Sequence, residues 1–297
     1  MKKFLCAAII TVILFILNIS TATTSAHAWS QRFHAEVAVN CLGLDYRYIP
    51  SYNARFGSFT PDFFWYLLNK GLITEKTANK LHGATEQECV DENTVYFYGI
   101  AADALQSEPW FRRVRLYYFV QGIATHVYAD IVAHDPDNGY IELWMDKFKG
   151  KVTDYVPDEA LHLALEFAVD ALLVAKDGFL LNDLLFCHTQ ANFLQKVLED
   201  EIGPLGFDVI AEFRKYATLV RALEKLAFLY APILKGEVDG VALLQSEESA
   251  LVDPNVLTIL LLYPNEIYET LTDENLHWET GLDDAILFCQ NPAPCPP

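Results

Sequence analysis

The sequence predicts an all-α protein with a single domain. Apolar residues recur at the helical i, i+3, i+4 spacing over long stretches, whereas alternating strand patterns are few and short. No internal repeat and no long linker divides the chain, and 52% of its residues are apolar, which suffices for one sizeable core. The expected domain spans residues 29–297, after removal of a leader over residues 1–28.

Each expected element follows from local signals. Asp91 and Asn93 are placed to cap a helix that ends near residue 106, ahead of Pro109. The long apolar periodicities predict helices over 113–135, 157–176, 189–202, 206–234 and 255–271. We expect loops near 44–60, 83–91, 136–156 and 235–254. The C-terminal part is expected to be helical over 170–275 and irregular over 276–297.

The N-terminus has the organisation of a secretory signal peptide. A basic start at Lys2 and Lys3 precedes an apolar run, and Ala26-His27-Ala28 forms a small-residue cleavage site. An uncleaved membrane anchor is the alternative, but the apolar run is short for a span. Cleavage after Ala28 makes Trp29 the first residue of an exported, periplasmic or extracellular protein.

Acidic side chains dominate the composition. The whole chain has a formal net charge of −19, from 21 basic and 40 acidic side chains. Loss of Lys2 and Lys3 with the leader leaves 19 basic against 40 acidic side chains, a net charge of −21. Such a field repels polyanions at long range, which makes a nucleic-acid partner unlikely, although bound metal ions override it locally.

Five cysteines remain after the leader is removed, and export permits disulfides. The odd number leaves at least one cysteine without a partner in the same chain. We expect Cys289 and Cys295 to close a small proline-rich loop, and Cys41 to pair with Cys89. The alternative is that all five, including Cys187, are free thiols. No C-x-x-C motif is present, so a cysteine-based zinc ribbon is not expected.

Two helical segments carry ionisable side chains one turn apart in apolar surroundings. In the first, His126, Asp130 and His134 lie four residues apart, and in the second His162 precedes Glu166 by four. Burying such groups is costly unless a partner neutralises them, and zinc prefers imidazole nitrogen and carboxylate oxygen. A hydrogen-bonded core histidine would explain one such pair. Two such segments favour a metal site.

Further candidate ligands precede these helices. His34 lies five residues after Trp29, Asp62 follows Pro61, and His82 comes later. In this order and spacing, the sequence resembles the zinc-dependent phospholipase C family, which is related to the S1/P1 nucleases. The His-x3-Asp-x3-His spacing is most similar to the branch that contains the catalytic domain of glycosylphosphatidylinositol-specific phospholipase D. The resemblance covers Trp29 to Glu166.

The resemblance implies up to three zinc ions. The ligands of the first are Asp62, His82 and His126, with Asp130 as a bridge. The second ion shares Asp130 and takes His34 together with the α-amino nitrogen and carbonyl oxygen of Trp29. The ligands of the third are His134, His162 and Glu166, which leave coordination positions open to water.

The resemblance also implies an activity. A metal-activated water would hydrolyse a phospholipid, with Asp62 orienting or deprotonating that water, and the protein would contact a membrane surface transiently. One alternative is a single-strand-preferring nuclease of the S1/P1 type with the same metals. A second alternative is an exported protein that binds zinc for stability without catalysis. The sequence leaves the oligomeric state open.

Other polar and aromatic residues are expected to stay outside the metal centre. His188 and His277 are interpreted as surface or core residues. Asp170 is interpreted as a solvated carboxylate, with a role as hydrogen-bond partner of a ligand histidine as the alternative. The aromatic run over 63–66 forms either an apolar wall for a lipid headgroup or part of the core.

Overall fold

The computed structural model describes residues 31–83, 89–135, 138–177 and 188–295, so the leader, Trp29 and Cys187 lie outside the described residues. Within these ranges every regular element is a helix, and β-type pairing is limited to an isolated bridge between Val90 and Pro294. The all-α prediction is therefore confirmed. None of the helices in these ranges has the length and apolar character needed to cross a bilayer.

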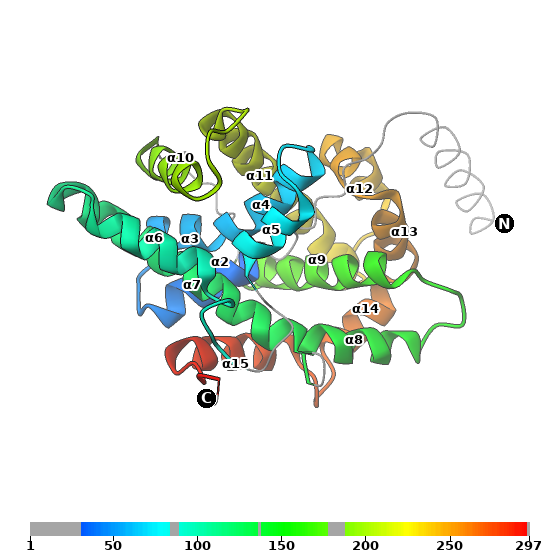
Figure 1. Ribbon diagram of the computed structural model, residues 1–297. Coiled ribbons are helices and arrows are strands. Elements are labelled where there is room, and N and C mark those ends of the chain that lie inside the picture. Colours follow the sequence, from blue (N-terminus) through cyan, green and yellow to red (C-terminus); the bar gives the residue numbers. More distant parts are fainter. Residues whose placement is uncertain (1–30, 84–88, 136–137, 178–187, 296–297) are drawn as a thin grey trace.

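The helices vary widely in length and are connected mostly by short turns (Figure 1). In chain order they are α2 (Gln31–Cys41), α3 (Ile49–Ser58), α4 (Thr60–Asn69), α5 (Glu75–His82), α6 (Tyr96–Gln106), α7 (Trp110–His134), α8 (Tyr140–Lys149), α9 (Asp158–Asp177), α10 (His188–Ile202), α11 (Val209–Leu234), α12 (Val241–Gln245), the 3-10 helix η1 (Glu247–Leu251), α13 (Pro254–Leu262), α14 (Pro264–Leu271) and α15 (Trp278–Gln290).

The longest predicted helices are confirmed as α7, α9, α10 and α11, with ends that shift by a few residues. The helix predicted to end near residue 106 is confirmed as α6, but its predicted cap is wrong. Val95 precedes α6 without a side-chain cap, and Asp91 accepts the backbone N–H groups of Asn93 and Thr94 at 2.8 Å in the turn before it. The single helix predicted over 255–271 is wrong. Pro264 divides it into α13 and α14, since proline lacks an N–H and excludes helical geometry at the residue before it.

Among the described residues, three α-helices and the 3-10 helix η1 lie in stretches that were expected to be loops. In α8 the buried residues Ile141, Trp144, Met145 and Phe148 follow helical spacing, a pattern that the flanking polar residues obscured. Helix α3 is short and has few large apolar residues, and its backbone packs directly on α7. The short helix α12 is the third. Loop predictions fail here because packing overrides local composition.

The sequence predicted an irregular C-terminal segment over 276–297, and this prediction is wrong. Helix α15 occupies 278–290, and the ring Nδ1 of His277 caps it by accepting the backbone N–H of Glu279 at 3.3 Å. Trp278, Leu282 and Ala285 on its inner face are buried, and the helix packs on α2 and α7. Charged residues on the outer face hid this stripe in the sequence.

Both predicted disulfides are wrong. The structure contains Cys41–Cys289 and Cys89–Cys295 instead. Helix α15 lies along α2 and brings Cys289 beside Cys41, and the segment after α15 pairs with Val90 next to Cys89. Sequence proximity misled the prediction, since the partners are 248 and 206 residues apart.

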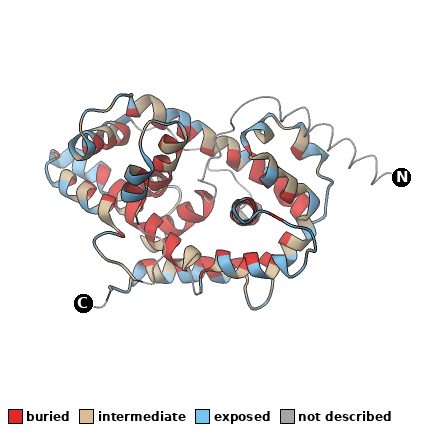
Figure 2. Ribbon diagram, turned by 45° about the vertical axis from the view of Figure 1, so that its right-hand side comes forward, coloured by how far each residue is buried: buried red, intermediate tan, exposed pale blue. Residues whose placement is uncertain are grey.

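Buried residues occur along most helices, mainly on the sides that face other helices (Figure 2). The buried apolar residues form two clusters. One cluster centres on α8, α9, α11 and α13–α15, and the other on α3–α7, α10 and the first half of α11. Helix α2 contacts both α7 and α9 and contributes to both clusters. It therefore carries its side chains into the space between the two longest candidate ligand-bearing helices.

Candidate metal centre

Five helices bring the predicted ligand side chains together: α2, α4, α5, α7 and α9. Every predicted ligand except Trp29 lies in the described part of the chain, and these eight residues form three groups whose ligand atoms lie within 4.8 Å of one another. The groups are His34, His126 and Asp130; Asp62, His82 and His126; and His134, His162 and Glu166. The first two share His126, and we call their combined five residues the buried group.

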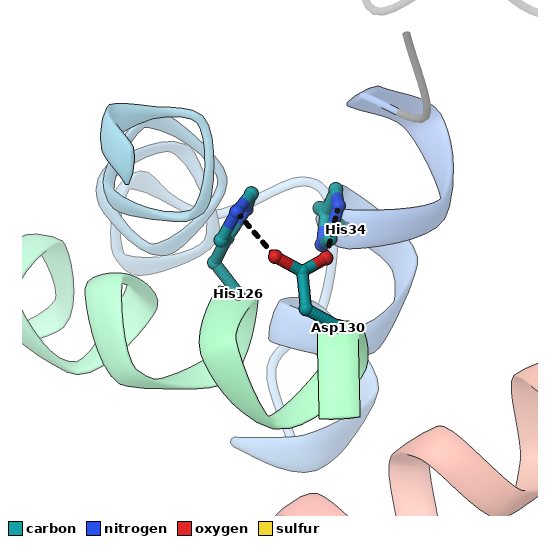
Figure 3. Close-up of side chains that lie close together, drawn as sticks. All are labelled: His34, His126 and Asp130. Carbon is teal, nitrogen blue, oxygen red and sulfur yellow. Dashed lines mark ion pairs between the residues drawn. The ribbon is translucent and has the colours of Figure 1, made fainter. Parts of the chain in front are cut away.

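Asp130 lies at the centre of the buried group. Its Oδ1 is 3.3 Å from Nε2 of His34, and its Oδ2 is 3.1 Å from Nε2 of His126 (Figure 3). The two carboxylate oxygens thus face different histidines, one from α2 and one from α7. This is the arrangement that a carboxylate needs in order to bridge two ions.

Asp62 and His82 complete the buried group from the side of α4 and α5. His82 Nε2 lies 3.5 Å from Oδ1 of Asp62 and 3.5 Å from Oδ2 of Asp130. The Nε2 atoms of His82 and His126 approach to 3.2 Å. Pro61 stands in the first turn of α4, so that Asp62 enters the group from a helix N-terminus.

The donor set fits zinc. Two ligand atoms that each lie about 2.0–2.1 Å from one tetrahedral zinc are about 3.3–3.4 Å apart. The nitrogen–oxygen and nitrogen–nitrogen distances in the buried group run from 3.1 to 3.7 Å, with His126 to Asp62 the longest. Nδ1 of His34 is buried and has no hydrogen-bond partner among the described residues. Buried imidazoles and carboxylates at these separations have the composition and spacing of a zinc site.

The third group lies at the C-terminal end of α7. His162 and Glu166 stand one turn apart on α9, and Glu166 Oε1 is 3.2 Å from Nε2 of His162 and 3.5 Å from Nε2 of His134. The two imidazole rings stack with centroids 4.9 Å apart. The side chains of His134 and His162 are 18% and 29% exposed, so this half-exposed group is open to solvent where the buried group is not.

Two glycines allow helices α3 and α7 to pack closely next to the buried group. A Cβ atom on Gly57 would lie 1.9 Å from the Phe119 carbonyl oxygen, and one on Gly122 would lie 2.0 Å from the Ala54 carbonyl oxygen. Helices α3 and α7 therefore cross in backbone contact. The crossing brings the Ser58 carbonyl oxygen to 2.7 Å from Nδ1 of His126. Nδ1 then donates this hydrogen bond, and Nε2 is left as the lone-pair nitrogen for a metal.

Two further side chains orient the ligands, and neither role was predicted from the sequence. Gln31 donates from Nε2 to Asp62 Oδ2 at 2.7 Å. Asp170 is buried and accepts the backbone N–H groups of Arg32 and Phe33 at 3.1 and 3.0 Å, which caps the start of α2 ahead of His34. Asp170 is thus neither solvated nor a partner of a ligand histidine, and both of its earlier interpretations are wrong.

Electrostatic coupling in the buried group is strong without metal. Burial opposes protonation of His126, but Asp130 and Asp62 outweigh it and raise the pKa of His126 to about 9. Burial and the neighbouring His126 lower the pKa of His34 to about 4. Burial would raise the pKa of Asp130, yet His126 and His34 hold it well below its usual value. The metal-free group therefore keeps Asp130 ionised beside a protonated imidazole.

The half-exposed group carries a similar charge pattern. Burial would raise the pKa of Glu166, but His162 and His134 lower it to about 2. Burial opposes protonation of His134, and the hydrogen bond to Glu166 raises the pKa of that ring. Glu166 is consequently ionised at neutral pH and is available as an oxygen ligand.

A pocket connects the two groups. Its lining includes His34 and Asp130 of the buried group and His134 and Glu166 of the third group, and its remaining wall is largely apolar, with Phe33, Ile141, Trp144 and Val169. No lysine or arginine lines it among the residues that the structure describes. The pocket therefore places an apolar wall next to ligand residues of both groups.

The aromatic run after Asp62 does not line this pocket. Phe63, Phe64 and Tyr66 are buried in the core, which confirms the packing interpretation for these residues. Trp65 is half-buried, and its ring centroid lies 5.7 Å from that of His82. The run therefore belongs to the core, and Trp65 packs against His82 of the buried group.

The two remaining histidines lie outside all three groups, as expected. His188 is exposed at the start of α10, and its Nε2 lies 3.5 Å from Nη2 of Arg214. His277 caps α15. Glycine inside a helical pattern was the one sequence signal that could have pointed to the crossing at Gly57 and Gly122. No such signal marks Gln31 or Asp170.

Comparison with known proteins identifies the family. A search of curated proteins and a search of solved structures each gave no match. A family model described as zinc-dependent phospholipase C matches residues 23–221, which is more than half of the chain and includes every candidate ligand. The match ends within α11, ahead of α12–α15. With this extent of match and an all-α fold, the chain belongs to the zinc-dependent phospholipase C family.

Proposed function

We propose that the chain is an exported zinc-dependent phosphodiesterase that hydrolyses phospholipids in the manner of a phospholipase C. The observation that carries the proposal is the convergence of His34, Asp62, His82, His126 and Asp130 in one buried group, with the half-exposed group beside it. Bound zinc would supply Lewis acidity toward a phosphate ester and lower the pKa of water into the neutral range. Up to three ions correspond to the three groups of donors.

The protein's own residues fix where this chemistry takes place. Asp130 presents one oxygen to each side of the buried group, so we assign it the bridging role. Asp62 is oriented by Gln31 through one oxygen and faces His82 with the other. We assign Asp62 the task of orienting the attacking water or accepting its proton, for which a fixed carboxylate is suited.

We further propose that the α-amino nitrogen and carbonyl oxygen of Trp29 complete the ligands around His34. Trp29 itself lies outside the described residues. The start of α2, two residues later, is held by Asp170 and by buried ion pairs from Arg32 to Asp177 and Glu224. These contacts hold the start of α2 in place next to His34, which supports the proposed ligation.

The pocket supports a phospholipid over a polynucleotide. Its wall is mostly apolar and carries no lysine or arginine among the described residues. A nucleic acid would require a basic track for its phosphates, and the net charge of −19 opposes one at long range. An acyl–glycerol moiety needs only the apolar wall and a phosphate within reach of the ligand groups.

Export is part of the proposal. The leader pattern over residues 1–28 supports it, and the disulfides Cys41–Cys289 and Cys89–Cys295 are consistent with an oxidising compartment. We propose a periplasmic or extracellular location. Mass spectrometry of the secreted protein should find Trp29 as its first residue.

A substrate panel tests the activity. Purified mature protein would be offered phosphatidylcholine, phosphatidylinositol and single-stranded DNA, each with and without chelator. Diacylglycerol release that the chelator abolishes is the expected result. Nucleotide release would instead indicate an S1/P1-type nuclease. Zinc in stoichiometric amount with no turnover of any phosphodiester would indicate a zinc-stabilised protein without catalysis.

A further inference from the structure

The first two turns of α7 expose an unusual number of large apolar side chains. Trp110 is 73% exposed, Val114 66%, Phe111 54% and Tyr117 49%. Trp110, Val114 and Tyr117 follow i, i+4, i+7 spacing and share one helix face. The opposite face, with Leu116, Phe119 and Val120, packs into the core. The helix therefore has an apolar face toward solvent as well as toward the protein.

Basic side chains surround this apolar face. Arg112, Arg113 and Arg115 are exposed among the same residues. Arg112 lies 3.5 Å from Glu108, a carboxylate that it shares with Lys196, and Arg113 and Arg115 form no ion pair among the described residues. In a chain with 21 basic and 40 acidic side chains, three arginines within four residues make a local positive charge against the overall sign. We call residues 110–117 the α7 tip.

We propose that the α7 tip docks on the surface of a bilayer that contains anionic phospholipid. Tryptophan and tyrosine favour the membrane–water interface, and a basic amphipathic helix binds anionic lipid through both its charge and its apolar face. The positive end of the helix dipole lies at the same place. Negative lipid headgroups thus complement the arginines while the interface receives Trp110 and Phe111.

Other occupants fit the tip less well. A second copy of the chain would bring arginines against arginines in a symmetric contact, between two molecules of net charge −19. A nucleic acid would contact the arginines but leave the apolar face exposed. The absence of a bilayer-spanning helix among the described residues is compatible with peripheral docking.

The tip and the metal ligands share one helix. In Figure 1 the N-terminal end of α7 forms the left-hand extremity of the molecule, away from the ligand-bearing part of the same helix. Trp110 and His126 are 16 residues apart, so the helical rise separates them by about 24 Å along the axis. Docking therefore takes place outside the metal centre and deepens the proposed function by naming the surface on which the lipid is encountered.

Vesicle cosedimentation of the zinc-loaded protein tests the proposal, with vesicles of phosphatidylcholine alone and with phosphatidylglycerol added. Trp110→Ala combined with Phe111→Ala should weaken binding to the mixed vesicles about tenfold or more. Tyr155→Ala with Phe228→Ala is the matched control, because these aromatic side chains are 89% and 48% exposed elsewhere, and it should bind as the unaltered protein does.

A second variant tests the charge. Replacing Arg112, Arg113 and Arg115 by Gln should reduce the preference for mixed over neutral vesicles about 100-fold. Thermal unfolding of each variant confirms the fold. Equal loss in the Tyr155→Ala and Phe228→Ala control, or no vesicle binding by the unaltered protein, would overturn the proposal. Headgroup release measured in the same samples reports turnover separately, so docking can fail or hold independently of the proposed activity.

Discussion

The buried group and the half-exposed group use the same chemistry in different surroundings. In the buried group no residue is more than 8% exposed, and two of its ligands have a hydrogen-bond partner outside the group, Ser58 for His126 and Gln31 for Asp62. In the half-exposed group the rings of His134 and His162 reach solvent and the pocket. We infer that a metal in the buried group would exchange slowly, whereas the half-exposed group leaves room for exchange with solvent. The predictions below test this division.

The largest effect is expected from the bridging carboxylate. Asp130→Asn should remove more zinc than Glu166→Gln, because Asp130 faces both sides of the buried group and Glu166 serves one group. Elemental analysis of the purified variants measures the loss. If Glu166→Gln lost as much zinc as Asp130→Asn, or more, the bridging role would be refuted.

The chain end provides the second test. Protein produced with a methionine retained before Trp29 should lose at least about tenfold in activity, since even outer hydrogen-bond partners of metal ligands change affinity or activity by that much. Zinc should be lost from the buried group, near His34, while the half-exposed group keeps its ion. Full turnover in protein with a verified Met-Trp29 start would rule out ligation by the α-amine.

The third test concerns the crossing of helices α3 and α7 next to His126. Gly122→Ala places a Cβ atom 2.0 Å from a backbone oxygen of α3, so the helices must separate and the unfolding free energy should fall by about 3 kcal/mol. Gly99→Ala is the matched control, because Gly99 is an exposed position within α6 with no atom within 4 Å of a new Cβ. It should be neutral or slightly stabilising.

Denaturant unfolding of both glycine variants checks this prediction, and zinc content checks its link to the site. Displacement of α3 moves the Ser58 carbonyl away from His126, so Gly122→Ala should also bind zinc more weakly in the buried group. Equal stability of Gly122→Ala and Gly99→Ala would contradict the close crossing.

The smallest expected effect is the release of protons when zinc binds. The pKa of His126 is about 9 in the metal-free protein, above its unfolded value, so this ring is protonated at neutral pH and must release its proton when zinc binds. His34, with a pKa of about 4, releases none. Calorimetry of zinc binding in buffers of different ionisation enthalpy should detect at least one proton released at neutral pH, and fewer above pH 9. No release at neutral pH would contradict the coupling of His126 to Asp130.

The sequence predicted the ligand-bearing helices well because their signals are local. The spacing of His126, Asp130 and His134 lies within one helix, and α7 and α9 have long apolar stripes. That Asp62 and His82 join them was inferred from the family resemblance alone, since no local pattern brings α4 and α5 toward α7. The structure brings these side chains together, and their binding of zinc stays a prediction.

The errors concern contacts between distant segments. In the sequence Asp170 is one of several polar residues on a helix. Its burial is explained by its hydrogen bonds to the backbone at the start of α2, more than 130 residues away. The disulfides were assigned by closeness in sequence, whereas the packing of α15 on α2 decides them. Helix α3 was missed because it is short and has few large apolar residues, and its backbone contact with α7 is not visible in the local sequence.

The connectivity of Cys41–Cys289 and Cys89–Cys295 has a consequence for biogenesis. A polypeptide that enters an oxidising compartment N-terminus first exposes Cys41 and Cys89 together, well before either correct partner has been translocated. Premature oxidation would join these two thiols to each other, and only attack by another thiolate could then reshuffle them. Secretion yield should therefore depend on a thiol–disulfide isomerase, and a host that lacks one should accumulate the chain with Cys41 bonded to Cys89.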